Sequence, residues 1–136
     1  MSMTEARAAI RQRVEANWTA TPICWFGEAF EHPDQRPWLM VERDAIPASQ
    51  SSIFGSTGKR VVQDPGMIIG TVYCPKHGGD DLAYALAEQF GELFRTQKVG
   101  PAQTDAPTMG PIDDGDDEGN WIRIAVTIPF TVSYFA

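Results

Sequence analysis

The sequence has few cysteines and histidines and no long apolar run, features on which several functional classes of protein depend. It has 2 cysteines and 2 histidines in 136 residues, too few for a disulfide framework or a metal centre with soft ligands. No apolar run approaches the roughly 18 residues of a membrane span, and the amino-terminal stretch lacks the apolar core of a signal peptide. Lys and Arg number 11 against 18 Asp and Glu, a net charge of −7, which argues against general affinity for nucleic acid. We expect one domain spanning residues 1–136, made in the cytoplasm and without membrane contact.

Cys74 and His77 are the reactive residues that lie closest together. A Cys–His pair can act as a nucleophile, and both residue types bind metals, but nothing in the apolar surroundings of Cys74 marks it as activated. The other candidate ligands, His32 and Cys24, are distant in sequence. We predict that both cysteines are reduced and structural, and that the protein has no catalytic residue, metal or cofactor. A small metal-binding or hydrolytic module is the less favoured alternative.

An acidic run after residue 112 is the most conspicuous charged feature. Its carboxylates are Asp113, Asp114, Asp116, Asp117 and Glu118. The run imitates the start of a helix–loop–helix calcium site, but Ala125 occupies the twelfth position, where such a site has a bidentate glutamate. We predict a solvated loop, or alternatively a surface whose negative charge lets DNA pass without sticking.

Apolar periodicity predicts two amphipathic helices. Ser2 and Glu5 have the spacing of a capping box at the start of the first, and Asp80 or Asp81 caps the second. The apolar stripes are Ile10, Val14 and Trp18 in the first helix and Leu82, Leu86, Phe90, Leu93 and Phe94 in the second. The arginines at positions 7, 11 and 13 are interpreted as the solvated face of the first helix.

Strands are predicted between and after the helices. Their ranges are 23–26, 38–41 with an extension towards 47, 53–54, 59–63, 67–73 and 121–134. Asp64-Pro65-Gly66 is a turn signal, and the Pro-, Gly- and Asp-rich stretch 99–119 predicts a long flexible excursion. These elements predict an α+β fold: a small, mainly antiparallel twisted sheet with two amphipathic helices packed on one face.

The last strand has the clearest pattern. Every even position from 122 to 134 is apolar, and most of the odd positions are polar, so one face meets a core and the other meets water or a partner. Pro129 cannot donate to a ladder, which predicts an edge strand or a bulge. A long exposed edge is either an aggregation hazard or an assembly surface, and we interpret this one as an assembly surface.

Five segments carry a resemblance to a known family. They are IRQRVEANWTATPICW (10–25), WLMV (38–41), Gly58-Lys59-Arg60 leading into GMIIGTVYCPKHGG (66–79), DDLAYALAEQFGELF (80–94) and WIRIAVTIPFTVSYF (121–135). Together they resemble the tail terminators, minor tail proteins of long-tailed bacteriophages.

The resemblance implies a structural virion protein and not an enzyme. Tail terminators form a homohexameric ring on the head-proximal end of the tail tube, where the ring ends tail polymerisation and offers a docking surface to the head–tail connector protein. Assembly in the bacterial host cytoplasm is implied, with the tube protein as a further partner and DNA passing through the lumen without specific binding. A head-completion or neck connector protein is the alternative.

A ring needs a heterologous interface whose rotation closes, and the final strand is our candidate for it. The expected interface residues are Arg123, Thr127, Pro129, Thr131 and Ser133. The carboxylates at 113, 114, 116, 117 and 118 are expected to face the lumen or the tube-facing rim of such a ring.

Overall fold

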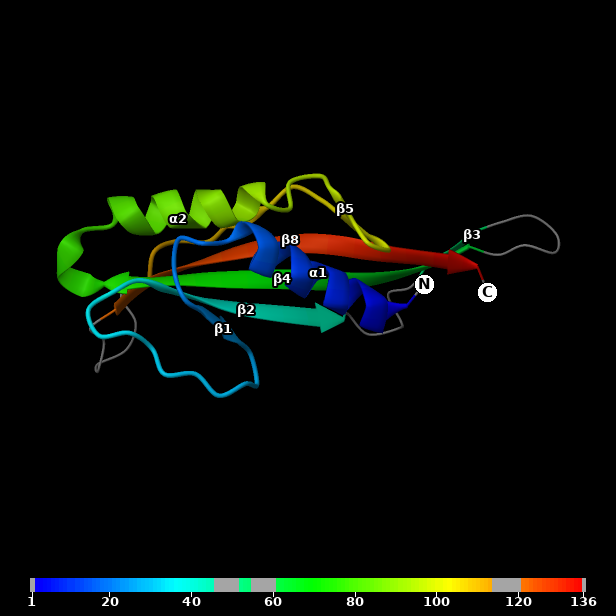
Figure 1. Cartoon of the computed structure of the whole chain (residues 1–136). Coiled ribbons are helices and arrows are strands. Elements are labelled where there is room, and N and C mark those ends of the chain that lie inside the picture. Colours follow the sequence, from blue (N-terminus) through cyan, green and yellow to red (C-terminus); the bar gives the residue numbers. More distant parts are fainter. Residues whose placement is uncertain (1, 46–51, 55–60, 114–120, 136) are drawn as a thin grey trace.

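The sheet is built around two fifteen-residue strands, β4 (Val61–Pro75) and β8 (Trp121–Phe135). They pair antiparallel without a break, from Val61 opposite Phe135 to Pro75 opposite Trp121 (Figure 1). The structure is a computed structural model that describes residues 2–45, 52–54, 61–113 and 121–135. At about 3.3 Å per residue each strand is roughly 50 Å long, and the other elements are arranged along this pair.

Shorter strands widen the sheet on both sides of the central pair. On the β4 side lie β2 (Trp38–Ala45), β1 (Ile23–Trp25) and, beyond the end of β2, β3 (Ser52–Phe54). On the β8 side lie β5 (Lys98–Val99), β6 (Ala102–Thr104) and β7 (Thr108–Met109). Only β1 and β2 pair parallel among the strand pairs of the described residues, and the order along the sheet is β1-β2-β4-β8-β6-β5.

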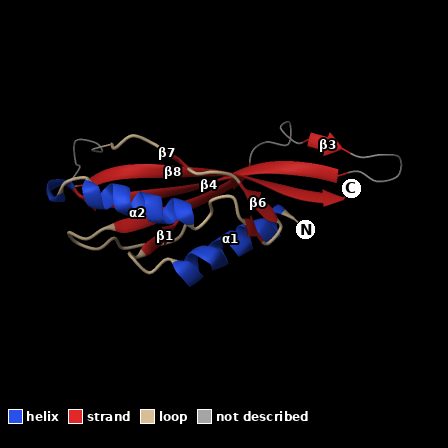
Figure 2. Ribbon diagram, turned by 90° about the horizontal axis from the view of Figure 1, so that it is seen from above, coloured by secondary structure: helices blue, strands red, loops and turns tan. Residues whose placement is uncertain are grey.

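Helices α1 (Met3–Asn17) and α2 (Asp81–Glu92) lie on the same side of β4 and β8 (Figure 2). Every even position of β8 from 122 to 132 is buried, as the alternation predicts. These side chains share one core with Ile10 and Val14 of α1 and Phe90 of α2. The curled sheet with two helices confirms the predicted α+β class, and the placement of the helices is broadly consistent with packing on one face.

The capping box of the first helix is confirmed, and for the second helix the start position agrees with the prediction. The Ser2 hydroxyl accepts a hydrogen bond from the Glu5 amide at 3.1 Å, the bond expected of the capping box. The second helix begins at Asp81 after Asp80, although no side-chain bond caps its first turn. It ends at Glu92, before Leu93 and Phe94 of the predicted apolar stripe.

The expected turn at Asp64-Pro65-Gly66 is wrong, because β4 runs straight through it. Pro65 falls between the positions that pair with β2, which reaches Gly66, and with β3, which reaches Gln63. No described strand on that side therefore needs a proton from its nitrogen. Because Gly66 has no side chain, the Phe130 ring can pack directly against it. A Cβ at position 66 would lie 2.2 Å from that ring.

The prediction of an edge strand is also wrong, because β8 lies between β4 and the strands β6 and β7. The Pro129 carbonyl accepts a hydrogen bond from the Asp105 amide at 2.9 Å, on the β6–β7 side. Since the amide and carbonyl of one strand residue point to the same side, the Pro129 nitrogen faces the gap between β6 and β7. The β4–β8 ladder is therefore complete without it.

Residues 98–113 form β5, β6 and β7 in place of much of the expected excursion; positions 114–119 lie outside the described residues. Thr104 is fully buried, and its hydroxyl donates to the Phe94 carbonyl and accepts from the Gln97 amide at 2.8 Å. The same side chain thus joins the segment after α2 to the strand that pairs with β8. Such a buried hydroxyl is stable because it is hydrogen-bonded.

Replacing Gly70 with alanine tests how closely α2 packs on β4. An added Cβ would lie 2.3 Å from the Phe90 ring, so we expect Gly70→Ala to lower the free energy of unfolding by about 1–3 kcal/mol through overpacking. Urea denaturation followed by circular dichroism measures the change. Gly78→Ala is the matched control, since nothing lies within 4 Å of its added Cβ. Equal stability of the two variants would contradict this packing.

Candidate interface

The five residues predicted from the final strand lie together on the sheet face away from the helices, here called the open face. They are Arg123, Thr127, Pro129, Thr131 and Ser133, at alternate positions of β8, and each is half-buried. In the described part of the chain neither helix lies on this side of β4 and β8 (Figure 2). The structure thus brings the predicted residues onto one surface.

The neighbouring strands make the open face more apolar than β8 alone suggests. Pro129 lies opposite Met67 of β4, and Thr127 lies opposite Ile69. One row further along, Met40, Thr71 and Ala125 share a register. Sequence reasoning missed these neighbours because the register between β4 and β8 is not readable from either strand by itself.

Arg123 and Asp113, predicted for two different roles, form an ion pair. The guanidinium donates to the Asp113 carboxylate at 3.0 and 3.1 Å, and the two residues form an isolated antiparallel bridge. The hydrogen bond to Asp113, with a second to Tyr73, raises the pKa of Arg123. The first carboxylate of the acidic run is therefore neutralised on the open face. Asp114, Asp116, Asp117 and Glu118 lie outside the described residues.

A hollow of about 350 Å³ lies beside this ion pair. Its lining includes Thr71, Tyr73, Ala125 and Pro111 as well as Arg123 and Asp113. The side chains of Arg123 and Asp113 remain 42% and 50% exposed, so both stay accessible to a partner. The hollow is a depression in the open face that a protruding side chain of a partner could fill.

An aromatic cluster closes one end of the open face. The Trp38 ring stacks on Tyr73 with centroids 4.0 Å apart, and His32 stacks on Trp38 at 5.8 Å. Phe30 and Trp121 complete the cluster. Trp38 is 8% exposed, and its indole nitrogen has no hydrogen-bond partner in the part of the chain that the structure describes. At this end of the sheet, aromatic residues of β2, β4 and β8 meet. The loop before β2 covers them with Phe30 and His32.

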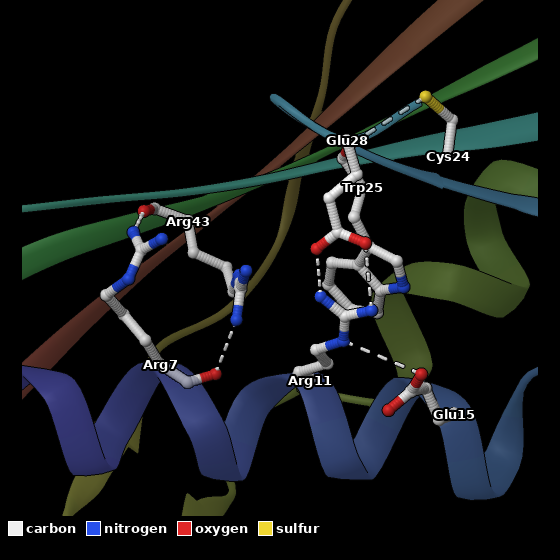
Figure 3. Close-up of polar contacts among 7 residues, drawn as sticks. All are labelled: Arg7, Arg11, Glu15, Cys24, Trp25, Glu28 and Arg43. Carbon is white, nitrogen blue, oxygen red and sulfur yellow. Dashed lines mark hydrogen bonds and ion pairs between the residues drawn. The ribbon is translucent and has the colours of Figure 1, made fainter. Parts of the chain in front are cut away.

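Two arginines stack on Trp25 on the helix side of the molecule (Figure 3). The guanidinium carbons of Arg11 and Arg43 lie 4.6 and 4.8 Å from the Trp25 ring centroid, within the range of a cation–π interaction. Arg11 also pairs with Glu28, which lowers the pKa of that carboxyl. The expected solvated helix face is therefore partly a structural contact to β1 and β2.

Arg7 and Arg43 are bonded to each other's backbone. Each guanidinium donates to the main-chain carbonyl of the other residue, the Arg43 bond being 2.9 Å long (Figure 3). Burial lowers the pKa of Arg43, and the positive charges of Arg7 and Arg11 lower it further. Within the described residues, no carboxylate lies at ion-pair distance from Arg7 or Arg43.

The Cys74–His77 pair is not arranged as a nucleophile and base. Cys74 is buried in the core, where burial raises its pKa to about 11, whereas His77 is exposed after β4. Both cysteines are free thiols. The described residues contain no group of three or more His, Cys, Asp or Glu side chains that could hold a metal ion. None of the described helices has the length and apolarity needed to cross a bilayer.

Comparison with known proteins points to one family. The family model described as phage tail terminator protein matches residues 5–130. No curated protein matches the chain. Among the 24 matching chains of solved structures, one is 19% identical with a TM-score of 0.70, and the match covers 100% of this chain and 99% of that chain. This structural likeness establishes the shared fold.

Thiol labelling tests the assignment of Cys74 as a core residue. With a pKa of about 11, only about one Cys74 thiol in a thousand is ionised at pH 8. We expect iodoacetamide at pH 8 to label the half-buried Cys24 well before Cys74, which reacts only when urea unfolds the chain. Mass spectrometry of tryptic peptides measures both rates. Rapid labelling of Cys74 in the folded protein would contradict its assignment as a core residue and would make it a candidate reactive thiol.

Proposed function

We propose, from the premise that the chain belongs to the phage tail terminator family, that it forms a ring on the head-proximal end of a phage tail tube. The family is one of structural tail proteins and not of enzymes, so the chain is a structural component of the tail. In this proposal the ring is a homohexamer that ends tube polymerisation and presents a docking surface to the head–tail connector. Its partners are its own copies, the tube protein and the connector.

The observation that carries the proposal is the family match over residues 5–130. The open face gives it physical support: it presents Met67, Ile69 and Pro129, half-buried and without a helix over them in the described part of the chain. Apolar surface of this kind is typical of protein–protein interfaces. We place the contact with a neighbouring subunit or the tube on this face, through Arg123, Thr127, Pro129, Thr131 and Ser133.

The charge of the chain fits a conduit for DNA. A net charge of −7 repels phosphate, so DNA would pass through the lumen of such a ring without specific binding. We propose that Asp113, Asp114, Asp116, Asp117 and Glu118 face the lumen or the rim that meets the tube. A ring reconstruction with these residues on its outer wall would exclude the lumen version.

Tail length in particles made without this gene tests the proposed role. We expect overlong tails of variable length and without heads, because no ring would stop the addition of tube subunits. Negative-stain electron microscopy measures the length distribution, and restoring the gene on a plasmid should restore uniform length. Tails of normal length that fail to join heads would instead assign the protein to the neck, as a head-completion or connector protein.

Charge reversal of Arg123 tests the open face as an interface. Arg123→Glu breaks an exposed ion pair with Asp113, so the free energy of unfolding should fall by at most about 1 kcal/mol, while ring assembly is lost or strongly weakened. Sedimentation velocity measures assembly, and urea denaturation measures folding. Arg95→Glu is the matched control, because Arg95 is also exposed and paired, with Glu92 of α2. Intact rings of the Arg123→Glu variant would remove the interface from this part of the open face.

A further inference from the structure

Arg7 and Arg43 flank an exposed aromatic ring that the core does not use. Phe26 is 67% exposed and lines a hollow of about 240 Å³ with Arg7, Arg43, Val41 and the carboxylate of Asp44. The residues Arg7, Phe26 and Arg43 are called the arginine patch below. An exposed aromatic side chain beside arginines is the composition found at the energetic centres of protein interfaces.

The start of α2 has the opposite composition. Leu82 is 50% exposed and Tyr84 is 41% exposed, although the sequence pattern placed Leu82 on the apolar face. Asp80 and Asp81 beside them are exposed, and no described cation lies at ion-pair distance from either. The residues Asp80, Asp81, Leu82 and Tyr84 are called the α2-start patch.

Where the structure describes the burial of side chains, the exposed large apolar residues are Phe26, Leu82 and Tyr84, and all three lie in these two patches. One patch is positive and the other is negative. They also lie at different places along the sheet: Arg43 pairs with Ile68, whereas α2 follows the end of β4 at Pro75, seven residues or about 23 Å further along the strand. Figure 1 shows the start of α2 at one end of the sheet and the second half of β2 well away from it.

We propose that the arginine patch of one copy binds the α2-start patch of the next copy. Two different, complementary patches make a head-to-tail contact, the type that closes into a ring and not into a two-fold dimer. Phe26 then packs against Leu82 and Tyr84, and Arg7 and Arg43 pair with Asp80 and Asp81. The inference rests on the proposed ring and names a contact within it.

The occupant is a protein surface and not a phosphate backbone. Arg7 and Arg43 are the cations of this region without a carboxylate at ion-pair distance among the described residues, because Arg11 pairs with Glu15 and Glu28. Two cations beside Asp44, in a chain of net charge −7, are too few for counterion-release binding. The exposed ring of Phe26 needs an apolar partner, which the α2-start patch offers.

Photo-crosslinking tests which surface covers Phe26. p-Benzoylphenylalanine is introduced at position 26, a mixture of 14N- and 15N-labelled full-length chains is irradiated alone and with purified tail tube, and peptides are identified by mass spectrometry. We expect mixed-isotope crosslinks between position 26 and the peptide containing Leu82 and Tyr84. The same probe at the exposed Asp105, which lies outside both patches, should not reach that peptide. Crosslinks from position 26 to the tube protein alone, or only within one chain, would overturn the proposal.

A charge swap tests the polar part of the contact. Arg7 is exposed and Asp80 makes no side-chain cap, so replacing both removes one described side-chain hydrogen bond, from Arg7 to the Arg43 carbonyl. We expect Arg7→Glu and Asp80→Lys each to weaken self-association by about tenfold and the double variant to recover most of it. Sedimentation velocity measures association, and circular dichroism confirms folding. Additive losses in the double variant would contradict the pairing.

The two proposals fail in different ways. Wild-type chains that form no ring, alone or on tail tubes, would overturn the ring and this contact together. Rings of wild-type size that persist in Arg7→Glu and Asp80→Lys would overturn the contact and leave the ring in place. Arg95→Glu serves as the control that should keep its rings, since Arg95 lies outside both patches and outside the open face.

Discussion

The unbroken pairing of β4 with β8 is the constraint on which the rest of the structure depends. It holds fifteen register pairs in one ladder, and every other strand, apart from β1 and β5 at the two sides, pairs directly with one of the two. The ladder tolerates Pro129 because its nitrogen faces a gap between partners. It tolerates bulky core side chains because Gly66 and Gly70 leave space for the rings of Phe130 and Phe90. The buried face thereby accepts α2 at close range.

The features that strong local patterns encode were predictable from the sequence. The alternation of β8 identified its buried face, and the capping box identified the start of α1 at Ser2. The turn expected at Pro65 was wrong because proline and glycine are local signals, whereas the neighbouring strands decide whether a missing amide proton matters. The strands β5, β6 and β7 span two or three residues each, too short for any periodicity. Without them, β8 was taken for an edge.

The candidate interface was predictable only in part. The alternation predicted which positions of β8 share one face, but that face also includes Met67 and Ile69, which only the register between β4 and β8 reveals. The arginine patch joins residues 7, 26 and 43 from α1, the segment after β1, and β2, and no linear pattern connects them. The proposed function rests on family membership and not on any single group of side chains.

The position of β8 also determines the order in which the fold can form. Its partners β4, β6 and β7 all precede it in the chain, so the position that β8 occupies is synthesised before the strand itself. Until then β4 has an unpaired edge and an uncovered apolar face, the features that make folding intermediates prone to aggregate. Contacts across such long sequence separations also slow folding. Insertion of β8 is therefore the step that removes this exposed edge and completes the buried face of the sheet.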